Sequence, residues 1–264
     1  MNKTVMIFLL LLTNASVCFP LSVQEFLKLG EKTILYSDIN EFRTIQFYED
    51  KTVEFIDAEY PNEDALWNKK YRYELIEKDK FLFLELQITN KKNYLILLSG
   101  ENLIVYSTND SKPIFNGVSK GSTELYFFPI EVVASSELVE GNKIYNANNI
   151  SNLNLDEPWI EGVKGYGIGE TITFSCNAEE MIVCTGYISI KKSYLWLQNS
   201  RPKSLKITFK KSGTSISYNL MDSPNPQRIT FGFIYSGEIQ ITILDVYPGT
   251  KYDDTCIHSI MLKY

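Results

Sequence analysis

The feature that most constrains the fold of this chain is an alternation of apolar and polar side chains with a period of two residues. Leu205, Ile207 and Phe209 alternate with Lys and Thr, and residues 239–243 repeat the pattern with three isoleucines. This spacing places one face of a β-strand on a core. Residues 223–226, which combine Pro, Asn and Ser, are typical of the turns between such strands. The pattern predicts an all-β protein built from antiparallel strands.

The first half of the chain shows the same alternation in shorter strands. Ile45 and Phe47 alternate with Thr and Gln, and the apolar residues of a longer strand lie on one face at Leu82, Leu84, Leu86 and Ile88. We expect a small antiparallel β domain, either an open sheet or a small barrel, over residues 21–115. Residues 116–133 are predicted to be a connector. Only Val23–Leu29 has the spacing of a helix.

The first eighteen residues have the layout of a signal peptide. Lys3 precedes the apolar run Val5–Leu12, and the small residues Ala15 and Ser16 follow it. The run is shorter than the roughly 20 residues that a membrane-spanning helix needs. We therefore expect an exported protein, which is periplasmic, surface-associated or secreted. Cys18 leaves open whether the mature N-terminus is lipidated or simply cleaved nearby.

The charge and the cysteine content limit what kinds of ligand the chain is expected to bind and whether it contains a disulfide. Residues 21–133 carry 13 basic and 19 acidic side chains, and residues 134–264 carry 12 and 13. Nucleic-acid binding, which needs a cationic footprint, is disfavoured. Three cysteines remain after the signal peptide, so we expect a disulfide in an oxidising compartment, with the pairing among Cys176, Cys184 and Cys256 left open. The spacing of cysteines and histidine gives no zinc signature.

The middle of the chain resembles the opening of discoidin, or coagulation-factor type C, domains. In these domains a strand with Ala-Ser-Ser leads to an Asn-hydrophobic pair and then to a Trp. The matching residues are Ala134-Ser135-Ser136, Tyr145, Ala147, Asn148-Asn149-Ile150, Asp156 and Trp159.

Four further blocks look like a bacterial branch of this family. That branch is the module attached to secreted NAD glycohydrolases, described as a translocation or NADase-type glycan-binding domain. The blocks are Trp159-Ile160-Glu161-Gly162, Gly165-Tyr166-Gly167-Ile168-Gly169-Glu170, Asn199-Ser200-Arg201-Pro202-Lys203 and residues 247–257. The resemblance implies a galactose-binding-like jelly-roll β-sandwich over residues 134–264 that docks onto cell-surface glycans. It does not imply NAD hydrolysis, because the catalytic domain of such proteins is a separate segment. The chain departs from the pattern at His258-Ser259, where Ser-Glu is usual.

The candidate ligand-binding residues lie in segments that combine aromatic and planar polar side chains, which suit the C–H faces and hydroxyls of sugars. They are Tyr166, Tyr194, Trp196, Asn199, Arg201, Lys203, Tyr252 and Asp254. Several alternatives stay open. Arg201 can instead pair with an acid such as Glu161, and Trp196 can pack in the core. Asp253-Asp254 can hold calcium or form a solvated turn. Trp159 is predicted to be a core residue.

No catalytic residues, metal site or cofactor are predicted. Gly165, Gly167 and Gly169 precede an expected strand rather than a helix, which indicates a glycine bend and not a nucleotide loop. His258 is the only histidine, and no partner for it is evident. We therefore expect a non-catalytic protein whose partner is a cell-surface glycan. The alternatives are a protein–protein adaptor or translocation module in the bacterial envelope, and a hydrolase in the first half that uses Asp57, Glu59, Glu63 and Asp64.

Overall fold

The computed structural model describes residues 34–38, 42–59, 66–99, 102–119 and 126–264 of the chain. The expected signal peptide at residues 1–18, the candidate lipidation site Cys18 and the expected helix Val23–Leu29 lie outside these residues. Among the described residues, none of the helices has the length and apolar character needed to cross a membrane.

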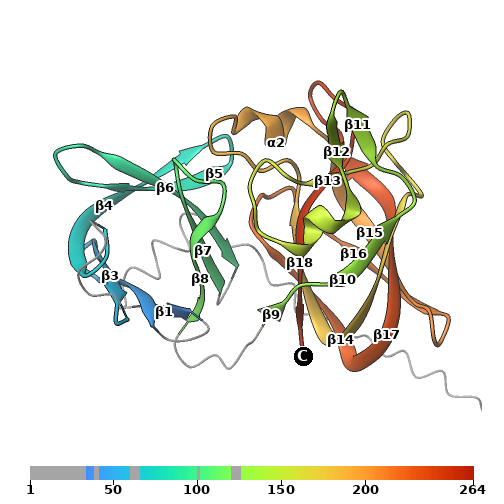
Figure 1. The fold of residues 1–264 in the computed structure, drawn as a ribbon, viewed down its shortest axis with the longest axis horizontal. Coiled ribbons are helices and arrows are strands. Elements are labelled where there is room, and N and C mark those ends of the chain that lie inside the picture. The colour runs from blue at the N-terminus through green and yellow to red at the C-terminus, as the bar shows by residue number, and fades with distance from the viewer. Residues whose placement is uncertain (1–33, 39–41, 60–65, 100–101, 120–125) are drawn as a thin grey trace, which may run out of the picture.

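The first domain is a closed barrel in which each strand pairs with the next (Figure 1). The eighth strand returns to the first, with Ser37 opposite Val118. All neighbouring pairs are antiparallel. The strands are β1 (Ile34–Asp38), β2 (Arg43–Phe47), β3 (Thr52–Asp57), β4 (Lys69–Lys78), β5 (Phe81–Leu86), β6 (Lys92–Ser99), β7 (Asn102–Ser107) and β8 (Pro113–Ser119).

Side chains fill the barrel. Ile45 and Phe47 of β2 point inward opposite Phe55 and Val53 of β3. Gly117 of β8 contributes no side chain, because a Cβ at this position would collide with the Phe115 ring and the Ser37 carbonyl. The close approach of β8 to β1 therefore requires glycine at the position where the barrel closes.

We expect that replacing Gly117 by Val will destabilise the protein by about 2–4 kcal/mol, because the added methyl groups force β8 away from β1. Urea denaturation measures the loss. Asn116→Val is the matched control, since Asn116 is exposed on the same strand. An equal loss in both variants would contradict the closure role of Gly117.

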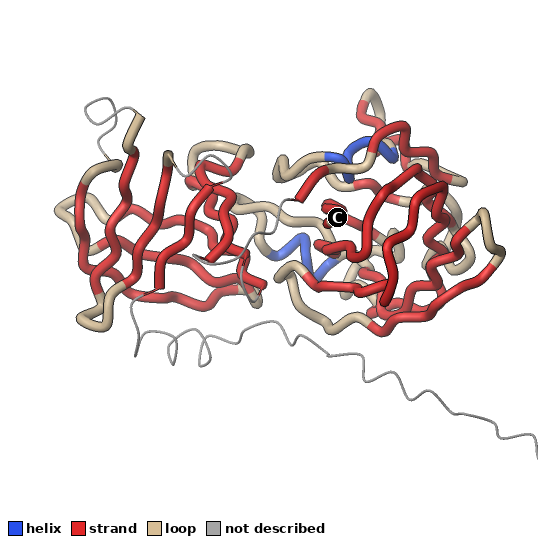
Figure 2. Tube along the Cα trace, turned by 90° about the horizontal axis from the view of Figure 1, so that it is seen from below, coloured by secondary structure: helices blue, strands red, loops and turns tan. Residues whose placement is uncertain are grey.

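The second domain is a β-sandwich that lies beside the barrel (Figures 1 and 2). Its largest sheet has the order β13-β18-β14-β17-β15-β16, with β10 paired to β14 and β9 paired to β18. The elements are β9 (Tyr126–Phe127), β10 (Ile130–Ala134), β11 (Leu138–Glu140), β12 (Lys143–Tyr145), η1 (Ala147–Ser151), β13 (Trp159–Ile160), β14 (Thr171–Thr185), α2 (Tyr194–Gln198), β15 (Arg201–Phe209), β16 (Thr214–Asn219), β17 (Gln227–Tyr247) and β18 (Cys256–Lys263).

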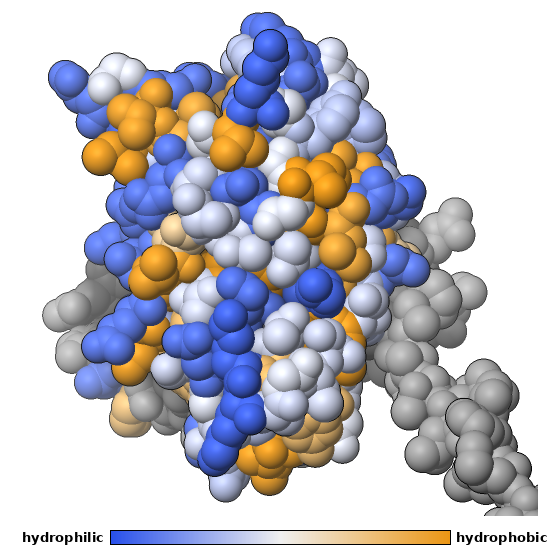
Figure 3. Space-filling model, turned by 90° about the vertical axis from the view of Figure 1, so that its right-hand side faces the viewer, coloured by the Kyte–Doolittle hydropathy of each residue, from blue (hydrophilic) through white to orange (hydrophobic). Residues whose placement is uncertain are grey.

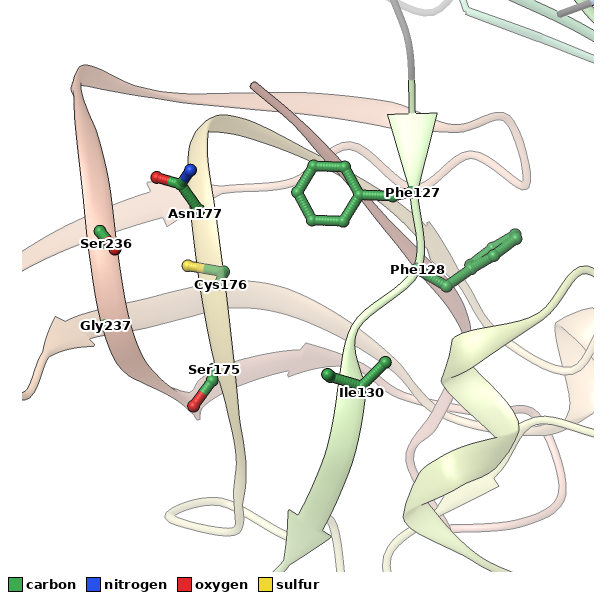
Figure 4. A pocket seen from close by; sticks show the side chains of 8 residues that line it. All are labelled: Phe127, Phe128, Ile130, Ser175, Cys176, Asn177, Ser236 and Gly237. Atoms are coloured by element: carbon green, nitrogen blue, oxygen red, sulfur yellow. The ribbon is translucent and has the colours of Figure 1, made fainter.

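Strands β14 and β17 bend sharply and run through both layers of the sandwich (Figures 1 and 4). Their pairing jumps from Ala178 opposite Tyr235 to Glu180 opposite Thr230, so β17 has extra residues at the bend. Gly232, with φ of 82°, lies among these extra residues and adopts a backbone conformation that other residues rarely reach. The two inner faces enclose one apolar core, in which Trp159 is fully buried as predicted. The prediction of an all-β chain with a jelly-roll second half is confirmed.

The outer face of β5–β7 packs against the sandwich. Six apolar side chains on this face join seven from the sandwich in one buried cluster. The barrel contributes Phe81, Phe83, Leu95, Leu97, Ile104 and Tyr106, and the sandwich contributes Leu153, Leu155, Ile182, Cys184, Ile188, Trp196 and Met261. Neighbouring strand residues face the barrel interior, as Leu82 and Leu84 do, so these strands are buried on both faces. An apolar interface of this kind holds two domains as one body.

The structure places the domain boundaries differently from the predicted ones. Residues 116–119, predicted as connector, complete β8 of the barrel, and residues 126–133, also predicted as connector, belong to β9 and β10 of the sandwich. The Asn and Gly residues that suggested a linker, Asn116 and Gly117, lie in strand β8 of the barrel. The glycine is required there because the close packing of β8 against β1 leaves no room for a side chain.

Candidate functional site

Three segments meet at the end of the sandwich that lies opposite the bend of β14 and β17, at the top of Figure 1. They are the loop 162–169, the segment 193–199 with the short helix α2, and the loop 248–255. We call them together the recognition end. Thr255 Oγ1 donates to the Tyr166 carbonyl at 2.8 Å, and the Tyr252 amide donates to the Gln198 carbonyl at 2.8 Å. These bonds join the three segments to one another.

The side chain of Glu161 connects two segments of the recognition end through hydrogen bonds. Its carboxylate is fully buried and accepts hydrogen bonds from the amides of Val163 at 2.9 Å and Thr255 at 3.1 Å. Burial raises the pKa of Glu161 above its usual range, against the opposing effect of these amides. Gly167 lies directly against the Glu161 side chain, and its φ of 62° keeps the loop close. Glu161 therefore fixes two of the three segments.

Three predicted tyrosines are exposed at the recognition end. Tyr166 is 40% exposed, Tyr194 is 48% exposed and Tyr252 is 37% exposed. The Lys251 ammonium lies 4.8 Å from the centroid of the Tyr252 ring. Its hydrogen bond with Tyr252 raises the pKa of Lys251, and the Tyr194 phenol adds to the effect. Exposed rings beside polar groups can contact a ligand that has both apolar faces and hydroxyls.

Asp254 adds a carboxylate to this end. Burial raises the pKa of Asp254, and the nearby charges of Glu140 and Asp253 add to the effect. Glu140 belongs to the β11–β12 hairpin, which the sequence did not connect with the site. The expected glycine bend is confirmed, since the loop with Gly165, Gly167 and Gly169 leads into strand β14.

Three of the predicted ligand residues are buried. Trp196 is 0% exposed, Asn199 is 6% exposed and Arg201 is 4% exposed. The Arg201 guanidinium lies 4.3 Å from the centroid of the Trp196 ring and donates through Nη1 to the Trp196 and Asn199 carbonyls. The prediction that these three side chains contact ligand is corrected, because the Arg201 and Trp196 side chains contact each other and the Asn199 side-chain amide donates to the Leu195 carbonyl.

Arg201 does not pair with Glu161, the acid that the sequence suggested. Its Nε donates to Asp222 Oδ1 at 2.9 Å. Lys203 is exposed on β15 and pairs with Asp245 at 2.6 Å, so it lies on the sheet and not in the loops of the recognition end.

The three described cysteines are free and buried. Their side chains lie in separate clusters, with Cys176 in the sandwich core, Cys184 against the barrel and Cys256 beside Tyr145 and Tyr187. The expected disulfide is therefore corrected, because side chains in different layers do not reach the geometry of a disulfide. Burial raises the pKa of Cys176 to about 11 and of Cys184 to about 12, so neither thiol ionises near neutral pH.

The alternative of a hydrolase in the barrel depended on four acids. Asp57 is 2% exposed and accepts from Arg43 Nε at 2.8 Å, with the Arg43 guanidinium 4.9 Å from the Trp67 ring centroid. The Glu59 amide also donates to Asp57, which makes Asp57 part of the barrel structure. Glu63 and Asp64 lie outside the described residues. The described residues contain no group of three or more His, Cys, Asp or Glu side chains arranged to hold a metal ion.

An apolar groove of about 410 Å³ lies at the opposite end, where β9 and β10 pass the bend of β14 (Figure 4). Phe127 points into it toward Cys176 and Asn177. The remaining lining residues are Phe128, Ile130, Ser175, Ser236 and Gly237. None of the predicted ligand residues lines this groove. The side of the sandwich that faces away from the barrel carries apolar groups separated by hydrophilic ones (Figure 3).

Comparison with known families decides the nature of the second domain. The family described as NAD glycohydrolase translocation F5/8 type C domain matches residues 126–263, more than half of the chain. The chain belongs to this family. The F5/8 type C domain of the chain thus contains all three segments of the recognition end. Among curated protein sequences, no relative matches the chain.

The solved structures that this chain resembles are distant from it in sequence. CBM32-1 of a family 31 glycoside hydrolase from Clostridium perfringens is 8% identical, with a TM-score of 0.36 over 52% of this chain and 96% of that one. GH31 CBM32-2 bound to GalNAc is 12% identical, with a TM-score of 0.34 over 54% and 99% of the two chains. The mycobacterial arabinofuranosyltransferase AftD is 11% identical, with a TM-score of 0.35 over 53% of this chain, which spans only 11% of the transferase.

His258 gives the domain a pH-dependent stability. The ring is fully buried, and neither nitrogen has a hydrogen-bond partner. Burial lowers the pKa of His258 to about 4, whereas an unfolded histidine titrates near 6.5. The unfolded state therefore binds the proton first as the pH falls below about 6.5, so stability is fully present above that pH and decreases toward about 4.

We expect His258 to lower the free energy of unfolding by roughly 2 kcal/mol between about pH 7 and about pH 5. Urea denaturation at both pH values measures the change. His258 is the only histidine, so His258→Gln should remove this part of the pH dependence. An unchanged pH dependence in H258Q would show that the ring is not the source.

Proposed function

We propose that this protein is exported and recognises carbohydrate on cell surfaces through the recognition end, without catalysis. The observation that carries the proposal is that three joined segments each expose a tyrosine, Tyr166, Tyr194 and Tyr252, and that Asp254 lies in the same loop as Tyr252. Aromatic faces contact the C–H patches of a sugar ring, and carboxylates and phenols exchange hydrogen bonds with its hydroxyls. Membership of the F5/8 type C family supports a binding function.

The rigidity of the recognition end suits this function. The bonds from Glu161 and Thr255 hold the loops in place before a ligand arrives. A preformed site loses less conformational entropy on binding than a mobile one. This matters for sugars, because each hydroxyl exchanges hydrogen bonds with water for hydrogen bonds with protein at a small net gain.

We expect the two-domain chain, residues 21–264, to bind on an array of galactose-, N-acetylgalactosamine-, glucose- and sialic acid-terminated oligosaccharides. Tyr166→Ala, Tyr194→Ala and Tyr252→Ala should each weaken binding roughly 5- to 30-fold, which is the effect of a contact of about 1–2 kcal/mol. Thermal stability should stay nearly unchanged, because the three side chains are exposed.

The matched control is Tyr264→Ala. Tyr264 is 65% exposed but follows Lys263, which pairs with Glu180 at the bend of β14, away from the recognition end. Full binding by the three tyrosine variants would remove the site assignment. An array without any signal would remove carbohydrate as the ligand.

An adaptor that docks an envelope protein is the second candidate. The observation that favours it is the exposure of Val139 and Ile144, which face each other on the β11–β12 hairpin and are 60% and 52% exposed. Apolar side chains of this size are more typical of protein contacts than of sugar contacts. An array without signal would leave this candidate as the favoured one.

A further inference from the structure

A β-hairpin of the barrel contacts the recognition end. Asp79 and Lys80 form the turn between β4 and β5, with φ values of 52° and 68°. Two residues with positive φ are typical of a tight hairpin turn whose twist matches its strands. We call residues Lys78–Phe81 the docking hairpin. Its tip meets the segment 193–199, which carries Tyr194.

Each residue at the tip of the docking hairpin has a partner in the sandwich. Asp79 Oδ2 accepts from the buried Ser193 hydroxyl at 2.5 Å. Lys80 Nζ donates to Asp222 Oδ2 at 2.7 Å and lies 5.4 Å from the Trp196 ring centroid. The buried Phe81 ring meets the Trp196 ring edge-on, with centroids 6.3 Å apart. The docking hairpin thus contacts the segment 193–199 through three side chains. Asp79 contacts Ser193, and both Lys80 and Phe81 contact Trp196.

Asp222 joins this contact to the interior of the sandwich. It accepts from Lys80 and from the buried Arg201, which itself lies against the Trp196 ring. Burial opposes ionisation of the carboxyl, but the hydrogen bonds from Lys80 and Arg201 outweigh it and hold the pKa of Asp222 below its usual range. Trp196 also donates from Nε1 to the Thr185 carbonyl at 2.9 Å. The ring is therefore held from both domains.

The contact extends from α2 to the next loop. The Thr250 amide donates to the Leu197 carbonyl, and the Tyr252 amide donates to the Gln198 carbonyl. Two of the three exposed tyrosines therefore depend on the placement of α2. Tyr194 directly follows Ser193, and Tyr252 lies in the loop that these carbonyls hold.

We propose that Asp79, Lys80 and Phe81 of the barrel are positioning residues for ligand recognition by the F5/8 type C domain, a role that rests on the proposed function. They touch no ligand. They fix α2 against the sandwich, and α2 fixes the backbone on which Tyr194 and Tyr252 stand. The barrel is thereby part of the binding apparatus and not a spacer.

Hydrogen exchange of the two-domain chain tests the positioning without any ligand. In Lys80→Ala, the amides of residues 192–200 and 248–255 should exchange about fivefold faster, because the local opening that exposes them becomes easier. The amides of Leu195, Asn199 and Tyr252, all hydrogen-bond donors in the structure, report this opening. Lys80→Arg, which keeps the cation, should restore slow exchange.

The matched control is Lys91→Ala. Lys91 also forms an ion pair, with Glu85 at 2.6 Å, but this pair lies within the barrel. Unchanged exchange in K80A, an equal acceleration in K91A, or an equal acceleration along β14 and β17 would each overturn the positioning role.

The oligosaccharide array described above, repeated with K80A and K91A, connects positioning to recognition. We expect K80A to lose about fivefold in binding and K91A to lose nothing. Full binding by K80A would overturn the proposal even if exchange changes. If the unaltered protein binds no oligosaccharide, the proposed function fails, and hydrogen exchange alone decides whether the hairpin positions the loops.

Discussion

The apolar contact between the outer face of β5–β7 and the sandwich determines how the rest of this protein is organised. Six barrel side chains are buried there, and burying one such side chain contributes on the order of 1.5–3 kcal/mol. A barrel can form a core with its inner face alone. The outer face of β5–β7 is also apolar here, and it is buried only when the barrel packs against the sandwich. The same contact brings the docking hairpin to α2. The placement of the recognition loops thus depends on packing that neither domain provides alone.

The strands were predictable because their alternation is local. Ile45, Phe47, Leu205 and Ile207 all point inward as their spacing indicates. The continuous apolar runs at residues 81–84, 94–98 and 103–106 are consistent with strands buried on both faces, but the sequence does not indicate which surface covers their second face. It also could not separate the Gly117 that closes a barrel from the glycine of a linker, because the collision that forbids a side chain there involves a residue on β1.

The candidate site was predictable in part for the same reason. Tyr166 and Tyr252 lie in turns that glycine and proline mark in the sequence, and both are exposed. Trp196 and Arg201 have the chemistry of a sugar site, but that chemistry also suits a contact between the two of them. The interaction partners of Trp196 and Arg201 determine that the two side chains are buried in the protein and do not contact ligand. These partners are distant from them in sequence. Asp222 follows Arg201 by 21 residues, and Lys80 lies 142 residues before Asp222.

The course of β14 and β17 through both layers has a consequence for the order in which the chain folds. Their pairing joins residues about 70 positions apart, such as Thr171 and Thr242. Strand β18, which lies between β13 and β14, is the last strand of the chain. Contacts between distant segments form slowly, because a large loop must close first. Most neighbouring strands of the barrel are consecutive in sequence, so its pairing closes smaller loops than the pairing of the sandwich, and we expect the barrel to form first.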